Sequence, residues 1–337
     1  MAFSPSPAYA GGDTIPKGRA EQALQQSVMD VGRRLKWRTV TTGSPGYWVF
    51  SFPEREVVKK VAGAMNGAVT LSPDATQIAF FDTHYPPLQN LGRAMDLVIE
   101  DLETGARQST GLMAREPSLL AWSPDEGRLA LFAKEAITDP NATWPQESLK
   151  TLIEGPRKPF KLFIFAIQNK TLELYDLPDI WNDDSLLKSS IFSDQIWSPD
   201  GNELLYTVTL DSKPPFRTEI HMFSLTTKTT RFLIQGDSPT WSPTSNRIAF
   251  RGSDGNYYLI NADGSGQELL LKVKKNFPDI VGPLLWSPDG RWLLVARWSS
   301  TPKELVDLFV MDPATRAMVR VEKESDGYFS WRGRRDD

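Results

Sequence analysis

Three aspartates stand just ahead of short apolar stretches and are the residues best placed to do chemistry. Asp194, Asp237 and Asp326 each precede a stretch with the length of a strand. If these strands line one channel, the three carboxylates lie around its mouth. Oxygen ligands of this kind can bind a cation, whereas Asp at such positions also serves as a turn or cap residue. Both interpretations stay open, and the identity of any metal is unknown.

Two arginines accompany the acids. Arg217 and Arg251 end or follow strands that we expect on the same side of the molecule. A guanidinium can pair with a carboxylate or hold an anionic ligand through two parallel hydrogen bonds. We therefore include both arginines among the candidate ligand-binding residues.

Aromatic and imidazole side chains in long irregular segments complete the candidate set. His84 and Tyr85 lie in a proline-rich segment, Trp144 and Trp181 lie in the two longest insertions, and Trp298 begins another loop. Large aromatic residues often anchor a long loop to the body of a protein. If they are exposed instead, they mark a binding patch.

A repeated sequence motif identifies the strands and turns that must position these residues. Five copies occur, each followed by a short apolar strand: Leu71-Ser72-Pro73-Asp74, Trp122-Ser123-Pro124-Asp125, Trp197-Ser198-Pro199-Asp200, Trp241-Ser242-Pro243-Thr244 and Trp286-Ser287-Pro288-Asp289. Proline and the following Asp, Asn or Gly residues are typical of a tight turn between two strands. Because the tryptophans recur at one structural position, we expect them to pack between neighbouring repeats.

A second hairpin alternates with the first, and it occurs six times, starting with residues 48–60. Two hairpins per repeat give a four-stranded antiparallel blade, and blades in series are typical of a β-propeller. The missing inner strand of the first blade is found at the other end of the chain, as Gly327-Tyr328-Phe329-Ser330-Trp331. The sequence therefore predicts an all-β, six-bladed propeller, closed by pairing its N- and C-terminal strands.

The N-terminal part lies outside the repeats. We expect a flexible leader over residues 1–16, an amphipathic helix over 17–38 packed on the propeller, and the propeller itself over 39–337. Ala8-Tyr9-Ala10 has the small-x-small pattern of a signal-peptidase site, although no basic start or apolar core precedes it. A periplasmic or extracellular location is expected, and a cytoplasmic one stays open.

The Trp-Ser-Pro-Asp-Gly phrase, with its strand and second hairpin, resembles the repeats of TolB-like propellers. The resemblance covers roughly residues 40–337 and recurs in register. It implies the fold, but one propeller fold hosts many functions. Related blades also occur in oligogalacturonate lyases and beside the hydrolase domain of prolyl oligopeptidases.

The sequence argues against several enzyme classes. It has no G-x-S-x-G nucleophile elbow, no cysteine and only two histidines, His84 and His221. Among 42 acidic residues, no pair can be singled out for glycoside hydrolysis. We expect no catalytic residue and no cofactor.

The net charge of −4 gives no reason to expect nucleic acid as a partner, and no stretch is long and apolar enough for a transmembrane helix. Long loops gather on the face opposite the Ser-Pro-Asp turns, and binding sites favour such loops. We therefore expect a monomeric, non-catalytic scaffold that binds a protein or peptide through the long-loop face and channel mouth. The alternative is a carbohydrate- or metal-handling propeller with lyase or hydrolase activity.

Overall fold

A computed structural model describes most of the chain. The described residues are 4–5, 17–43, 46–52, 57–62, 64–82, 95–138, 160–177, 193–210, 217–273, 280–298, 306–325 and 330–335. They form one helix, α1 (Lys17–Arg34), and strands that we label β1 to β24.

The strands in the first half of the chain are β1 (Ser4–Pro5), β2 (Leu35–Gly43), β3 (Gly46–Phe52), β4 (Val57–Ala62), β5 (Ala64–Leu71), β6 (Gln77–Asp82), β7 (Met95–Asp101), β8 (Arg107–Arg115), β9 (Leu119–Trp122), β10 (Arg128–Ala133), β11 (Glu135–Ile137), β12 (Lys161–Ala166) and β13 (Thr171–Tyr175). Those in the second half are β14 (Glu203–Thr209), β15 (Thr218–Ser224), β16 (Thr229–Trp241), β17 (Arg247–Gly252), β18 (Tyr257–Asn261), β19 (Glu268–Leu271), β20 (Ile280–Trp286), β21 (Leu293–Trp298), β22 (Val306–Met311), β23 (Met318–Ser325) and β24 (Ser330–Arg335).

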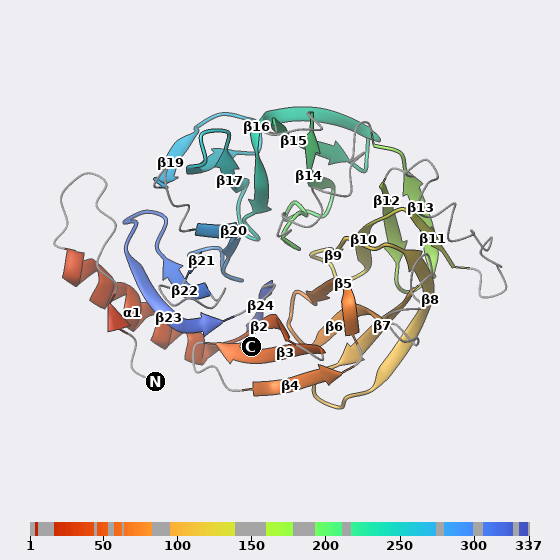
Figure 1. The fold of residues 1–337 in the computed structure, drawn as a ribbon, viewed down its shortest axis with the longest axis horizontal. Coiled ribbons are helices and arrows are strands. Elements are labelled where there is room, and N and C mark those ends of the chain that lie inside the picture. Colours follow the sequence, from red (N-terminus) through yellow and green to blue (C-terminus); the bar gives the residue numbers. More distant parts are fainter. Residues whose placement is uncertain are drawn as a thin grey trace.

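The sheets stand around a common centre, as Figure 1 shows, and the chain is an all-β propeller with one helix. The strand orders are β24-β2-β3-β4, β11-β8-β7-β6-β5, β13-β12-β10-β9, β14-β15-β16-β17-β18-β19 and β1-β23-β22-β21-β20. The prediction of six separate four-stranded blades is therefore not met as stated. The described residues form five hydrogen-bonded sheets, because β16 pairs with β15 and also with β17.

The ends of the chain share a sheet, as the sequence predicted. The C-terminal β24 pairs with β2, with Thr39 opposite Trp331, and β2 pairs in turn with β3. The strand β2 itself was not predicted, because the helix was expected to continue to residue 38. The helix ends instead at Arg34, and the β-favouring run Trp37-Arg38-Thr39-Val40 belongs to β2.

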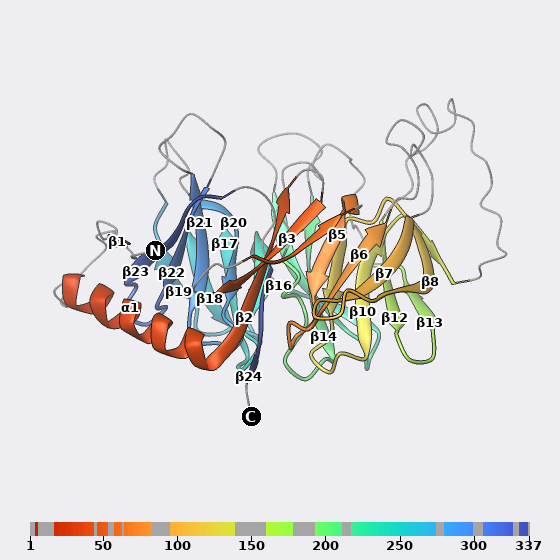
Figure 2. The same cartoon turned by 90° about the horizontal axis from the view of Figure 1, so that it is seen from below.

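The helix packs on the side of the ring. Its buried Leu24 and Val28 join an apolar cluster with Leu294 of β21, Val310 of β22 and Val319 of β23. In Figure 2, α1 lies alongside β22 and β23. The amphipathic pattern predicted a helix packed on the propeller, and Leu24 and Val28 make that contact.

The repeated serine explains why each Ser-Pro-Asp turn is so regular. The Ser198 hydroxyl donates to Asp200 Oδ1 at 2.6 Å and accepts the backbone N–H of Glu203 at 2.8 Å. Ser123 and Asp125 make the same arrangement, with the hydroxyl-to-carboxylate distance at 2.5 Å. Each turn is therefore closed by its own side chains, as well as by the geometry of its proline.

The repeated tryptophans join neighbouring inner strands. The indole Nε1 of Trp197 donates to the carbonyl of Ala121 at 3.1 Å, and that of Trp286 donates to the carbonyl of Thr240 at 3.2 Å. These side chains are 5% and 2% exposed. The expected packing of repeat tryptophans between neighbouring repeats is confirmed for these two residues.

Candidate functional site

Half of the residues proposed from sequence fall outside the described part of the chain. These are His84, Tyr85, Trp144, Trp181 and Asp326. The other five are described, and the structure brings two of them into direct contact.

Asp237 and Arg251 form an ion pair between β16 and β17. Arg251 donates from Nε to Asp237 Oδ1 and from Nη2 to Oδ2, both at 2.8 Å. Burial alone would lower the pKa of Arg251, but the hydrogen bonds and charge of Asp237 raise it above its ordinary value. Arg251 thus pairs with one of the three candidate aspartates, which was one of the two roles that the sequence suggested for it.

Trp298 and Arg217 stand at strand ends and are exposed. The Trp298 side chain, at the end of β21, is 43% exposed. Arg217 directly precedes β15. Trp298 thus lies where the chain leaves a strand, whereas Arg217, which was expected to end or follow a strand, precedes one.

Asp194 lies at the centre of the ring and is fully buried. Its Oδ2 accepts hydrogen bonds from Thr70 Oγ1 of β5 at 2.8 Å and from Ser330 Oγ of β24 at 2.5 Å. Arg332 Nη2 lies 3.5 Å from the same oxygen and donates to the Asp194 carbonyl at 2.9 Å. Asp194 therefore links its own segment by hydrogen bonds to two other sheets, those that contain β5 and β24.

The next residue, Gln195, extends these ties. Its Nε2 donates to the carbonyl of Trp286 at 2.7 Å and to that of Trp331 at 3.3 Å, and its Oε1 accepts the backbone N–H of Trp286 at 2.7 Å. The backbone N–H of Trp241 donates to the Gln195 carbonyl at 2.7 Å. The Asp194-Gln195 segment thus crosses the channel and forms a floor inside it.

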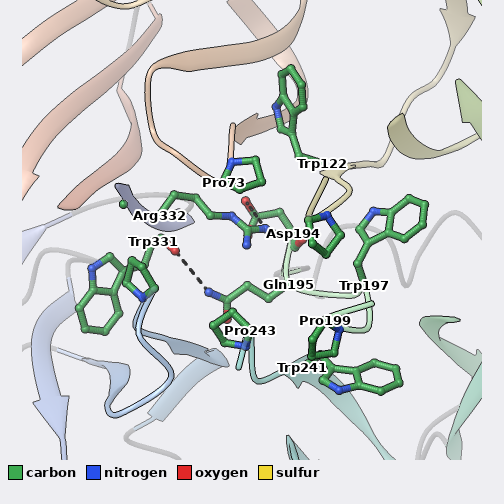
Figure 3. Close-up of a pocket in the computed structure, with 13 residues that line it drawn as sticks. Pro73, Trp122, Asp194, Gln195, Trp197, Pro199, Trp241, Pro243, Trp331 and Arg332 are labelled. Carbon is green, nitrogen blue, oxygen red and sulfur yellow. Dashed lines mark hydrogen bonds and ion pairs between the residues drawn. The ribbon is translucent and has the colours of Figure 1, made fainter. Parts of the chain in front are cut away.

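A cavity of about 180 Å³ sits at this floor. Its wall contains the prolines of all five repeats, Pro73, Pro124, Pro199, Pro243 and Pro288, together with Trp122, Trp197, Trp241 and Trp331. Figure 3 shows the Arg332 side chain reaching between the prolines, next to Asp194 and Gln195. Since these prolines belong to the short turns, the cavity lies at the channel mouth that these turns surround, and not on the face where the sequence led us to expect the site.

Asp194 was among the residues proposed from sequence, but its neighbours Arg332 and Gln195 were not. Arg332 follows the buried Trp331, at the place where the other repeats carry serine, and Gly333 stands where they carry proline. That departure from the repeat is the signal that could have identified Arg332. No comparable signal marked Gln195, whose role depends on contacts with distant strands.

The described residues contain no cluster of three or more His, Cys, Asp or Glu side chains that could hold a metal ion. In the same part of the chain, no helix is long and apolar enough to cross a membrane.

The ring of sheets around a shared channel defines this chain as a β-propeller. Among solved structures it is similar to TolB from Acinetobacter baumannii, with 15% identity and a TM-score of 0.57, covering 88% of this chain and 66% of that protein. It is also similar to a putative TolB from Agrobacterium tumefaciens, with 14% identity and a TM-score of 0.53, covering 90% and 99% of the two chains. The fold is therefore that of a TolB-like propeller.

An enzyme of known structure also shares this fold. An oligogalacturonate lyase in complex with manganese matches with 14% identity and a TM-score of 0.50, covering 85% of this chain and 72% of that one. No family profile matches the sequence, and no curated protein sequence does. At these identities the likeness establishes the fold alone.

Proposed function

We propose that this protein is a non-catalytic scaffold that binds a protein or peptide partner at the mouth of its central channel. The observation that carries the proposal is the cavity above Asp194 and Gln195. Its floor is fixed by hydrogen bonds to strands of several sheets, and its wall is built from the repeat prolines. Such a preformed recess binds a projecting group without first having to be ordered.

The size of the cavity favours one side chain of a polypeptide over a larger ligand. A pocket for a drug-sized ligand occupies about 300–1,000 Å³, whereas this cavity measures about 180 Å³. A partner would place one residue in the cavity and rest on the surrounding turns. An ordinary protein interface covers about 800 Å² per partner, so contacts beyond the cavity belong to the proposal.

The long-loop face remains a second proposed surface. Trp298, the last residue of β21, is 43% exposed, and large exposed aromatic residues are favoured at interfaces. Arg217, Asp237 and Arg251 would supply polar contacts beside it. For His84, Tyr85, Trp144, Trp181 and Asp326 the proposed role rests on the sequence alone.

We also infer that the six-stranded sheet consists of two blades. Up to Gln235, β16 pairs with β15, and from Gly236 it pairs with β17. At Gly236 a Cβ atom would lie 2.4 Å from the Arg251 carbonyl oxygen, so the strand turns there at a position reserved for glycine. Counted in this way, the described strands would form six blades. A periplasmic or extracellular location and a monomeric state complete the proposal.

Site-specific photocrosslinking tests the proposed surface. A benzoylphenylalanine at Pro124, on the rim of the cavity, should crosslink one recurrent partner peptide in cells that express the protein at its normal level. The same group at Pro313, in an outer turn between β22 and β23, serves as the matched control. Crosslinking from position 298, with none from position 124, would move the interface to the long-loop face. Crosslinking from none of the three positions would contradict a protein-binding role.

A further inference from the structure

The surface that the cavity offers to an occupant is formed mainly by proline rings. Pro124 is exposed, and the other four prolines of the wall are half-buried. Asp194 and Gln195 lie beneath them and are 0% and 5% exposed, so an occupant reaches the pyrrolidine rings rather than these polar side chains. Covering apolar surface of this kind is favourable by about 25 cal/mol per Å². The wall therefore favours an apolar group.

One cationic side chain reaches into the cavity. Figure 3 shows the Arg332 guanidinium between the prolines, and this side chain is 13% exposed. Its Nη2 donates to the Asp194 carbonyl at 2.9 Å and lies 3.5 Å from Asp194 Oδ2, so its position is fixed and its charge is paired. An aliphatic occupant would displace water from the guanidinium and give nothing in return, whereas the face of an aromatic ring attracts a cation. The cavity therefore favours an aromatic side chain over an aliphatic one.

The inner turns around the cavity are mostly acidic. Their acidic residues are Asp74, Asp125, Glu126, Asp200 and Asp289. Within the same turns (residues 73–76, 124–127, 199–202, 243–246 and 288–291) the sequence has a single basic residue, Arg291. The other arginines of this mouth belong to β24, where Arg334 and Arg335 follow Arg332. A partner segment with basic residues is therefore attracted to the sectors of the inner turns, and an acidic segment is repelled.

We propose that the cavity takes one aromatic side chain from a partner segment in which lysine or arginine residues flank that aromatic residue. The ring packs against the repeat prolines and faces the Arg332 guanidinium, and the flanking cations lie beside the acids of the inner turns. A cavity of about 150 Å³ is enough for benzene, and this one measures about 180 Å³. This inference rests on the proposed function, because it names the chemistry by which the partner is recognised.

Capped tripeptides provide the probes. Acetyl-Lys-Phe-Lys methylamide is titrated into the ¹⁵N-labelled full-length protein, next to matched peptides with the sequences Lys-Leu-Lys, Lys-Ala-Lys and Glu-Phe-Glu. The Arg332 Nε–H signal, assigned by its loss in Arg332→Lys, reports occupation, because the ring current of an aromatic group over the guanidinium shifts it. We expect Lys-Phe-Lys to bind at least about threefold more tightly than Lys-Leu-Lys. At low salt it should bind at least about tenfold more tightly than Glu-Phe-Glu, and high salt should reduce that second difference.

Two charge variants locate the binding. Asp200 is exposed, and its hydrogen bonds within the described part of the chain are to the neutral Ser198 and Asn202. Asp200→Asn should therefore weaken binding of Lys-Phe-Lys by about threefold. The equivalent position of another repeat is Thr244, so this turn forms without a carboxylate. Asp263→Asn removes the same charge from an outer turn that does not line the cavity, and it should leave the affinity unchanged.

Each remaining outcome overturns a stated part of the inference. Equal or tighter binding of Lys-Leu-Lys or Lys-Ala-Lys would overturn the aromatic assignment. Equal or tighter binding of Glu-Phe-Glu, or equal effects of the two charge variants, would overturn the basic flanks. If no peptide moves the Arg332 signal, the inference is wrong as a whole. The crosslinking experiment decides the protein-binding role separately.

Discussion

Ser330 and Asp194 are 136 residues apart in sequence, and the Ser330 hydroxyl donates to Asp194 Oδ2 at 2.5 Å. Thr70 of β5 donates to the same oxygen from another sheet, at 2.8 Å. Two sets of interactions therefore close the ring: the pairing of β24 with β2, and the hydrogen bonds to the buried Asp194 carboxylate in the channel. The same carboxylate belongs to the floor of the cavity, so closure and cavity depend on one residue.

Ser330→Ala should weaken the closure of the ring, because it removes the hydrogen bond to Asp194 while leaving the backbone pairing of β24 intact. The substitution removes one donor from a buried carboxylate, which costs about 1–3 kcal/mol of the free energy of unfolding. Chemical denaturation measures the loss. Ser265→Ala is the matched control, because Ser265 makes a similar bond to Asp263 in an exposed turn, and it should change stability by less than about 0.5 kcal/mol. Equal effects of the two variants would show that the Asp194 network does not support closure.

Deleting residues 326–337 should destabilise the whole ring. The deletion removes β24, exposes the edge of β2 and takes away Trp331, which is fully buried. Loss of a buried aromatic side chain alone costs about 3–5 kcal/mol, a large part of a typical stability of about 5–15 kcal/mol. Thermal unfolding followed by circular dichroism gives the result. A truncated protein with the melting temperature of the full chain would contradict closure by β24.

The Ser-Pro-Asp turns should lose stability in acid. The hydrogen bond from Ser198 is the largest cause that holds the pKa of Asp200 below its ordinary value, against an opposing effect of burial. The unfolded chain therefore binds this proton more tightly than the folded one. The contribution of Asp200 is present above the ordinary carboxyl pKa and is lost as the pH falls through the folded pKa.

Ser198→Ala should consequently raise the pKa of Asp200, as read from the carboxyl carbon by NMR titration. Asp254 is the internal control: burial opposes its shift, but hydrogen bonds from Tyr258 and Asn256 hold its pKa below the ordinary value. It should titrate as before in the variant. If the pKa of Asp200 is the same in Ser198→Ala as in the unmodified protein, the hydrogen bond from Ser198 is not what lowers it.

Much of the fold was predictable because its signals are local and repeated. Each Ser-Pro-Asp phrase forms its own turn through bonds between residues two to five positions apart, as at Ser72, Asp74 and Gln77. Recurrence of this phrase fixed the propeller architecture. The strand β2 was missed because it follows the helix directly, with no turn residue between Arg34 and Leu35. The joining of two sheets through β16 was missed because a Gly-Asp-Ser-Pro sequence reads as a break between strands.

The site was far less predictable. Asp194 was chosen as one of three equivalent acids around a channel mouth, yet Asp237 pairs with Arg251 on neighbouring strands, while Asp194 bonds to Thr70 and Ser330. The sequence cannot distinguish these environments, since each depends on residues far away in the chain. Loop length directed attention to the opposite face, whereas the cavity is built from the short turns whose prolines had been assigned only a structural role.

The packing of helix α1 attaches the N-terminal segment to the ring. Leu24 is 5% exposed and packs in one cluster with Leu294, Val310 and Val319. Leu24→Ala should lower the free energy of unfolding by about 2–5 kcal/mol, through lost apolar burial and the cavity left behind. Gln22→Ala, on the exposed face of the same helix, should change it by less than about 0.5 kcal/mol. Both values come from urea denaturation of the full-length protein. Hydrogen exchange should show faster exchange of the α1 amides in Leu24→Ala while the β10 amides keep their protection. Unchanged exchange in α1 would mean that this contact does not hold the helix to the propeller.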